Sequence, residues 1–227
     1  MQGLSDLANG GHPRAIWLIS PMFACAFRRD PHGVGIAVDT FQLIVVEDHP
    51  AVAAGVERLL GAEADLEVVG VAVGCGEGVS LAEKLRPDVA IVDMHLADGN
   101  GIRLTQELID RKLTRSVVVY TAFADDLVGL AALVAGASAV VGKGRLGSEL
   151  VDAVRAAARG GTVRPRITID GLVEAAGRVD PDDIPILGML VHGTSPAEVG
   201  EVLGVHEREL AGRRKRMLRA LLGEPRP

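Results

Sequence analysis

Residues 89–93 read Val89-Ala90-Ile91-Val92-Asp93, an apolar run that ends on a carboxylate. A short run of this kind is typical of a strand that is buried on both faces, as in a parallel sheet. Similar runs recur between residues 41 and 145, and segments with helical periodicity separate them. We expect strands at 42–47, 66–72, 88–93, 116–121 and 138–142, and helices at about 50–61, 77–86, 101–111, 126–135 and 147–160.

This alternation predicts an α/β domain over residues 41–160, with a doubly wound five-stranded parallel sheet. The composition agrees, because 48% of the residues are hydrophobic but only 3% are aromatic. Cores must then be built from Val, Leu, Ile and Ala, which favours parallel sheets covered by helices over aromatic-rich β-sandwiches. A chain of 227 residues is also long enough for a second, smaller domain.

Polar residues stand at the ends of four of the expected strands. They are Glu47 and Asp48, Asp93, Thr121, and Lys143. In a doubly wound sheet such residues meet at the edge where ligands bind, beyond the carboxyl ends of the strands. Three carboxylates at one place repel each other unless a cation is bound, and oxygen ligands of this kind suit Mg²⁺. The pattern predicts a magnesium site with a nucleophile, a hydroxyl and an ammonium group beside it.

These segments resemble the receiver domain of bacterial response regulators, which has a flavodoxin-like fold. The resemblance covers residues 41–160 and lies in Leu43-Ile44-Val45-Val46-Glu47-Asp48-His49-Pro50, Val92-Asp93-Met94-His95-Leu96-Ala97-Asp98-Gly99-Asn100-Gly101, Tyr120-Thr121-Ala122 and Gly142-Lys143.

The resemblance implies a role for each matched residue. Asp93 is the phosphoacceptor, and a sensor histidine kinase is its phosphodonor. Thr121 is the switch hydroxyl, and Lys143 contacts the phosphoryl group. The implied Mg²⁺ ligands are Glu47, Asp48, Asp93 and the backbone carbonyl of His95.

Two positions depart from the receiver pattern. Val140 stands three residues before the lysine, where the family usually has an aromatic residue whose rotation reports phosphorylation, and Ala97 replaces a common proline. A competing class, phosphatases of the haloacid dehalogenase type, forms the same aspartyl phosphate but needs a second Asp two positions after the nucleophile. That position is His95, so the sequence indicates that the chain is not an enzyme acting on external phosphate esters.

The first 40 residues fall outside this pattern. We interpret residues 1–40 as a disordered extension or as translation assigned from too far upstream. Their apolar stretch at 15–27 contains Pro21 and is too short to span a bilayer, which needs about 20 apolar residues. Cys25 and Cys75 are too few for a disulfide framework or a zinc site. A cytoplasmic location with no membrane association is expected.

The C-terminal third changes character. We expect a linker at 161–179, in which residues 167–176 could hold a short helix, followed by a small all-α domain at 180–223. Asp180-Pro181 begins a helix that becomes regular only at Asp183 or Ile184 because of Pro185, and Ser195-Pro196 begins another. The segment 193–210 resembles the helix-turn-helix of LuxR/NarL-type regulators, which implies binding to promoter DNA.

The last expected helix is basic. Residues 205–219 contain six Lys or Arg against two acidic residues, although the whole chain has a net charge of −6. Basic side chains on a recognition helix neutralise DNA phosphates, and its first half faces the bases. By the family alignment, Ala211, Gly212 and Lys215 lie at base-contacting positions. The expected backbone contacts are Arg208, Arg213 and Arg216, while Arg214 falls at the inward spacing after Leu210.

The family usually continues into a further helix that supports dimerisation, whereas this sequence stops soon after Leu222. A homodimer is therefore expected to form through the receiver or on DNA. Because Ala211 and Gly212 cannot hydrogen-bond to bases through side chains, a second hypothesis stays open. The chain could instead be a phosphorylation-dependent, protein-binding signalling adaptor whose C-terminal domain has lost sequence-specific DNA binding.

Overall fold

The computed structural model describes residues 25–29, 35–145 and 147–224. The chain divides into two compact units, Met1–Asp39 and Thr40–Pro227. In the first unit, β1 (Cys25–Arg29) and β2 (Gly35–Asp39) pair antiparallel, with Cys25 opposite Asp39. Residues 1–40 were expected to be a disordered extension or translation assigned from too far upstream. The pairing of β1 with β2 differs from disorder in these two strands, and it does not test where translation starts. The rest of that expectation lies outside the described residues.

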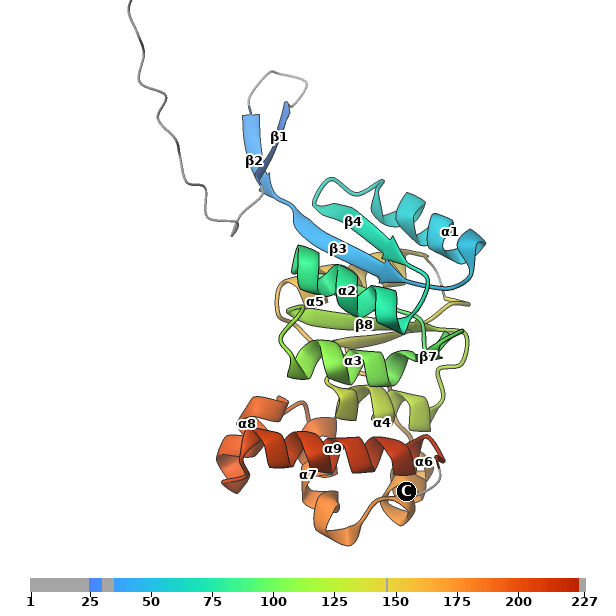
Figure 1. The fold of residues 1–227 in the computed structure, drawn as a ribbon, viewed down its shortest axis with the longest axis vertical. Helices are drawn as coiled ribbons and strands as arrows, with labels where there is room; N and C mark the ends of the chain where they lie inside the picture. Colours follow the sequence, from blue (N-terminus) through green and yellow to red (C-terminus); the bar gives the residue numbers. More distant parts are fainter. Residues whose placement is uncertain (1–24, 30–34, 146, 225–227) are drawn as a thin grey trace, which may run out of the picture. The chain divides into compact units, whose positions relative to one another are not determined.

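The second unit contains the predicted parallel sheet (Figure 1). Its strands run in the order β4-β3-β5-β8-β9, and every neighbouring pair is parallel. The order reverses between β3 and β5, so the binding edge of a doubly wound sheet lies beyond the ends of these two strands. The strands are β3 (Phe41–Val46), β4 (Leu66–Ala72), β5 (Val89–Val92), β8 (Ser116–Thr121) and β9 (Ala139–Gly142).

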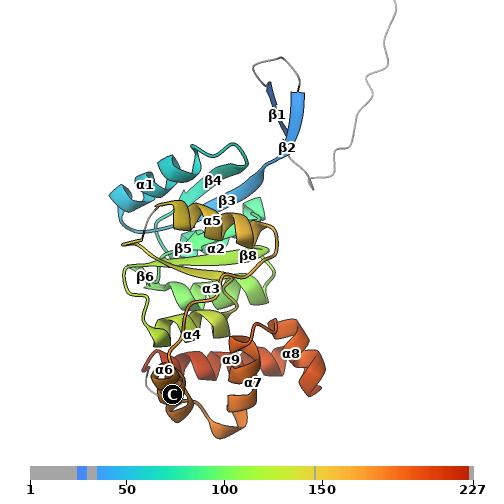
Figure 2. The same ribbon diagram turned by 180° about the vertical axis from the view of Figure 1, so that it is seen from behind.

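Helices cover both faces of the sheet (Figures 1 and 2). The β3 side chains alternate between two cores: Leu43 and Val45 pack with helices α1 and α5, whereas Ile44 and Val46 pack with α2 and α3. Burial on both faces explains why the central strands are apolar throughout. The helices of this region are α1 (Pro50–Leu60), α2 (Cys75–Leu85), α3 (Gly101–Asp110), α4 (Asp126–Ala135) and α5 (Gly147–Ala158).

The C-terminal region consists of helices in the described residues, as predicted. The 3₁₀ turn at Pro181–Asp183 precedes α7, so the regular helix begins at Ile184 as Pro185 requires. Ser195 and Glu198 form a capping box at the start of α8. The helices are α6 (Ile169–Arg178), α7 (Ile184–Val191), α8 (Pro196–Leu203) and α9 (Glu207–Leu221).

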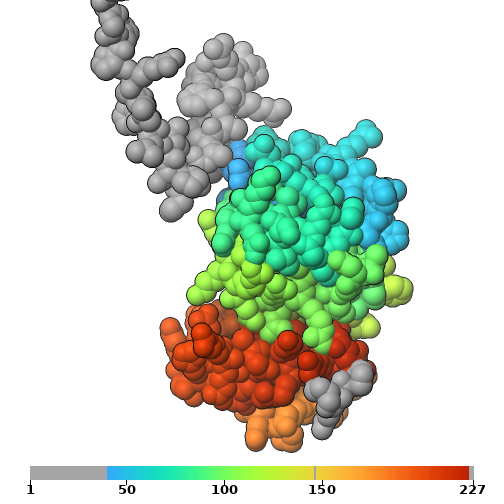
Figure 3. All heavy atoms as spheres, in the orientation of Figure 1, coloured from blue at the N-terminus to red at the C-terminus, as the bar shows by residue number. Residues whose placement is uncertain are grey.

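Helix α4 joins the two regions. Its residues from Val128 to Ala135 are all buried, because one side packs on the sheet and the other packs on α9. One continuous apolar cluster includes Leu130 of α4 together with Leu210 and Leu218 of α9. Figure 3 shows the C-terminal residues, in red and orange, in direct contact with the green receiver residues. A helix that is apolar all round needs burial on both sides, and α9 provides the second.

Candidate functional site

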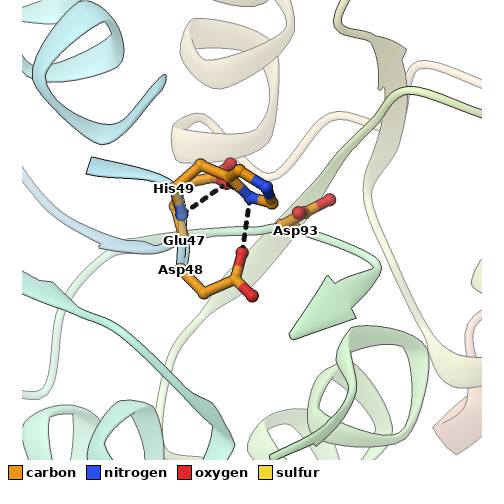
Figure 4. A group of neighbouring side chains, drawn as sticks. All are labelled: Glu47, Asp48, His49 and Asp93. Atoms are coloured by element: carbon orange, nitrogen blue, oxygen red, sulfur yellow. Dashed lines mark hydrogen bonds and ion pairs between the residues drawn. The ribbon is translucent and has the colours of Figure 1, made fainter. Parts of the chain in front are cut away.

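The predicted acidic residues meet at the switch point of the sheet. Glu47 follows β3, Asp93 follows β5, and both side chains are buried, with 3% and 5% of their surface exposed. Asp48 completes the group. One ligand atom from each of these residues and one from His49 all lie within 4.8 Å of one another (Figure 4). The geometry brings together every side chain predicted to hold the metal.

Magnesium fits this donor set. Asp48 Oδ1 is buried and, alone among the buried side-chain oxygens and nitrogens of the described residues, accepts no hydrogen bond. His49 Nδ1 lies 2.7 Å from this oxygen (Figure 4). A buried carboxylate oxygen without a hydrogen-bond donor is costly unless a cation satisfies it. His49 is largely exposed, but its ring nitrogen reaches the acidic group.

Lys143 balances the negative charge of this site. Its ammonium group donates to Glu47 Oε2 at 2.7 Å and lies 2.9 Å from Asp93 Oδ2. Burial by itself lowers the pKa of Lys143, but the hydrogen bonds to Glu47 and Asp93 outweigh it, so the pKa is raised. Lys143 is therefore a permanent positive charge beside the predicted nucleophile.

Thr121 lies at the end of β8 and is completely buried, but its hydroxyl is engaged locally. Thr121 Oγ1 accepts a hydrogen bond from Phe123 N at 3.2 Å and donates to Phe123 O at 3.4 Å. Phe123 itself is exposed, and its ring lies edge-on to His95 with a centroid separation of 5.9 Å. The hydroxyl predicted to be the switch is thus bonded within its own loop.

The segment after Asp93 is fixed at two helix N-termini, an arrangement that was not predicted. Residues His95–Leu96 (β6) and Gly99–Asn100 (β7) form a small hairpin. At its turn, the Asp98 carboxylate accepts from Cys75 N at 2.7 Å and Gly76 N at 3.1 Å, at the start of α2. Asn100 caps α3 by accepting from the backbone N–H of Ile102 at 2.8 Å.

The predicted DNA-contacting residues of α9 fall into two groups. Arg208, Lys215 and Arg216 are exposed. Ala211, Gly212 and Arg213 are only partly exposed, and the Ala211 carbonyl accepts a 3.2 Å hydrogen bond from Gln106 Nε2 of α3. The helix therefore presents its middle to the receiver region.

Arg213 has an intramolecular partner that the sequence did not reveal. Its Nε donates to Asp183 Oδ1 at 2.5 Å, and Asp183 is almost completely buried at the end of the 3₁₀ turn. A second nitrogen of Arg213 donates to the Asp182 carbonyl. In this conformation Arg213 links α9 by hydrogen bonds to the residues that precede α7.

Arg214 points inward, as its spacing predicted, but its charged end also reaches the receiver region. Only 2% of Arg214 is exposed, and its guanidinium contacts Asp110 of α3 and backbone carbonyls of α4. Burial lowers the pKa of Arg214, and the neighbouring Asp110 carboxylate offsets this only in part. Its partners come from a region far away in the sequence, so spacing could not identify them.

Known proteins are similar both to the receiver region and to most of the whole chain. The family model described as the response regulator receiver domain matches residues 43–155. The DNA-binding transcriptional activator DevR/DosR of Mycobacterium tuberculosis is 31% identical over 190 residues, which cover 79% of this chain and 88% of that protein. This chain belongs to the LuxR/NarL-type two-component response regulators.

Other response regulators are similar over the same regions. The transcriptional regulatory protein LiaR of Bacillus subtilis is 30% identical over 71% of this response regulator and 82% of its own length. A LuxR-family response regulator from Aurantimonas sp. SI85-9A1 is 29% identical, with a TM-score of 0.53 over 56% of this chain and 91% of that structure. RcsB of Salmonella typhimurium, 21% identical with a TM-score of 0.53 over 83% of this chain and 94% of that structure, shares the fold. Among the described residues, no helix is both long and apolar enough to cross a membrane.

Proposed function

We propose that this response regulator is phosphorylated on Asp93 by a sensor histidine kinase and that phosphorylation controls binding of α9 to promoter DNA. The observation that carries the proposal is the position of Asp93. This buried carboxylate lies at the switch point of the sheet, beside Lys143 and within the acidic group of Glu47 and Asp48.

The proposed transfer uses few groups. A carboxylate oxygen of Asp93 attacks the phosphorus of a kinase phosphohistidine, a P–O bond forms and the P–N bond breaks. The histidine nitrogen keeps the electron pair and takes up a proton. Lys143 stabilises the charge on the phosphoryl oxygens from its place at 2.9 Å from Asp93.

Mg²⁺ is the proposed cofactor, held by Glu47, Asp48, Asp93 and the backbone carbonyl of His95. When bound, it neutralises charge on the phosphoryl oxygens. The chain's own contribution is to hold these oxygens together, through the β3 and β5 ends and the Asp98 and Asn100 caps. We propose no turnover of external phosphate esters, because His95 stands where phosphatases of the haloacid dehalogenase type have their second Asp.

Thr121 is the proposed link to the rest of the molecule. To bond with a phosphoryl group on Asp93, its hydroxyl must leave the backbone of Phe123, so the loop before α4 must rearrange. Val140 packs beside the α4 cluster where an aromatic relay is usual, so the signal must pass through this loop and α4. A phosphoryl group adds roughly −1.5 to −2 charges, enough to reorder a loop by new hydrogen bonds.

The output proposed is DNA binding through α9. In the described conformation the Ala211 carbonyl accepts a hydrogen bond from Gln106 of α3, so the helix has to separate from α3 and α4 before it can enter a major groove. A similar protein, DevR/DosR, is described as DNA-binding, which supports the proposal. The proposed boundaries are 41–160 for the receiver, 161–179 for the linker and 180–223 for the DNA-binding domain.

The second candidate is the protein-binding adaptor. It is favoured by Ala211 and Gly212 at base-contacting positions and by Glu207 and Glu209 in the first turn of α9, where acidic groups repel phosphates.

Selection of genomic DNA fragments by the full chain separates the two candidates. We expect enrichment of specific fragments by the wild type after treatment with a small-molecule phosphodonor and Mg²⁺, and much weaker enrichment by Asp93→Asn. Absence of enrichment with and without the phosphodonor would favour the adaptor.

A further inference from the structure

The buried guanidinium of Arg214 donates three hydrogen bonds to the receiver region, one from each of its nitrogens. Its Nε donates to the Val134 carbonyl at 2.7 Å, and its Nη2 donates to the Ala135 carbonyl at 2.7 Å. Its Nη1 donates to Asp110 Oδ1 at 2.6 Å. These three partners come from α3 and α4, whereas Arg214 belongs to α9. A single side chain of the DNA-binding helix therefore bridges both helices of the receiver surface.

The acceptors of Arg214 are chemically suited to a cation. Val134 and Ala135 form the last turn of α4, where carbonyls have no partner within the helix and the helix dipole is negative. The helix ends at Gly136, whose φ of 90° is in the left-handed region that favours glycine. A Cβ there would lie 3.2 Å from Arg214 Nη2, so a side chain at position 136 would press on the guanidinium.

The opposite end of α4 is bound to the linker before α6. Asp126 Oδ2 accepts a 3.1 Å hydrogen bond from Thr168 N and a further one from the Thr168 hydroxyl. Asp125, the preceding residue, caps α4 by accepting from Val128 N at 2.8 Å. The loop that holds Thr121 leads directly into this end. The carbonyls that bind Arg214 lie at the far end of the same helix, so a movement of this loop that carried α4 with it would also move them.

Burial of Arg214 in α9 carries a desolvation cost, because its charged guanidinium is removed from water. Leu210 and Leu218, on the same inward side, are apolar and fill the core. An apolar side chain would provide such burial without the cost of removing a charge from water. The hydrogen-bond acceptors of the guanidinium belong to the receiver region. Arg214 therefore stabilises the conformation in which α9 packs on the receiver, and a separated C-terminal domain lacks these hydrogen bonds.

We infer that Arg214 is a latch that holds α9 on the receiver, and that it is released when displacement of α4 moves the Val134 and Ala135 carbonyls. The trigger rests on the proposed function of Asp93, whereas the latch itself rests on the contacts of Arg214. The planar guanidinium supplies diverging donors to three acceptors at once, which a lysine ammonium on a longer stem reproduces poorly.

Hydrogen–deuterium exchange of the full chain, without phosphodonor and without DNA, tests the latch. Arg214→Gln removes the charge, and Asp110→Asn removes the carboxylate while leaving the C-terminal domain intact. Lys215→Gln is the matched control, because Lys215 is the next residue of α9 and is exposed. Circular dichroism of each variant checks that its helices are retained.

We expect exchange in α9 and in the last turn of α4 to rise about tenfold in Arg214→Gln, and to rise less in Asp110→Asn, because charge-assisted hydrogen bonds are lost. Lys215→Gln should match the wild type. Wild-type exchange in both latch variants, or an equal rise in Lys215→Gln, would overturn the inference. If Arg214→Gln loses helix content, Asp110→Asn decides the matter. A second arm adds a small-molecule phosphodonor and Mg²⁺ to the wild type. If the latch variants exchange faster without phosphodonor but the wild type with phosphorylated Asp93 does not, the latch is supported and the proposed trigger is refuted.

Discussion

The ammonium group of Lys143 lies 2.9 Å from Asp93 and 2.7 Å from Glu47, so one cation serves two buried carboxylates. Removing one partner of a buried ion pair is costly, because the other charge stays buried without compensation. Without a metal ion, the stability of the acidic site therefore depends on Lys143.

Substitution Lys143→Met should lower the free energy of unfolding by about 3 kcal/mol in the presence of EDTA, measured by urea denaturation. Mg²⁺ should restore more stability to this variant than to the wild type, because the metal neutralises the same carboxylates. Lys112→Met, at an exposed position, is the control. An equal increase in the free energy of unfolding on adding Mg²⁺ to the variant and to the wild type would show that Lys143 and the metal do not neutralise the same carboxylates.

The pH dependence of this contribution follows from the raised pKa of Lys143. A lysine whose pKa is higher in the folded state stabilises fully below its ordinary value of 10.5, and this stability is lost as the pH rises through the folded pKa. The stability difference between wild type and Lys143→Met should therefore stay constant between about pH 7 and 9 and decrease only in strong alkali. A difference that vanished near neutral pH would show that Lys143 is not held as proposed.

Two neighbouring basic residues of α9 should behave differently. Arg213→Gln leaves the buried Asp183 without its 2.5 Å partner and should destabilise the chain by about 2–3 kcal/mol. Lys215→Gln should leave stability unchanged but reduce the salt dependence of DNA binding by about one unit of log–log slope. Thermal unfolding measures the stability of both variants, and a salt titration measures their DNA affinity. A destabilised Lys215→Gln together with an Arg213→Gln of wild-type stability would contradict these assignments.

Cys75 should react slowly with alkylating reagents. Burial and then the nearby Asp98 charge raise the pKa of the Cys75 thiol to about 11. At pH 8 this leaves roughly a hundredfold less thiolate than a pKa of 9.0 would allow. In a Cys25→Ser background, iodoacetamide labelling should be faster in Asp98→Asn and unchanged in Asp170→Asn. If Cys75 in the Cys25→Ser protein reacted as fast as a free thiol, its pKa would not be raised as described.

Gly101 should tolerate no side chain. A Cβ at this position would overlap the Asp93 carbonyl, so Gly101→Ala must displace the segment that carries the phosphoacceptor. We expect a loss of about 3 kcal/mol or more. Gly55→Ala is the matched control, because a Cβ within α1 meets nothing at Gly55 and should stabilise the helix by up to about 1 kcal/mol. Denaturant unfolding of both variants gives the comparison.

The sequence predicted the sheet well because its strands are short, mostly apolar runs, four of which are followed by or end on a polar residue. The positions of Glu47, Asp93 and Lys143 followed from the rule that parallel strand ends share one edge. The β6–β7 hairpin was missed because strands of two residues have no periodicity. The Asn100 cap was a detectable signal, since Asn immediately before a helical pattern is a common N-cap.

Contacts between the two regions could not be predicted in the same way. Spacing placed Arg214 on the inward side of α9, but its partners Asp110 and Ala135 depend on how separate surfaces fit together. One signal was present in α4, whose sequence is apolar on every side and so requires burial on both. The pairing of β1 with β2 was also missed, because the apolar residues of both strands were assigned to an extension outside the fold.

Phosphorylation mapped to a single residue tests the central claim most directly. The full chain is incubated with a small-molecule phosphodonor, with and without Mg²⁺, and the modified peptide is identified by mass spectrometry. We predict a phosphoryl group on Asp93 that depends on Mg²⁺, is absent from Asp93→Asn and is retained in Asp98→Asn. Equal labelling of the wild type and Asp93→Asn would show that Asp93 is not the acceptor.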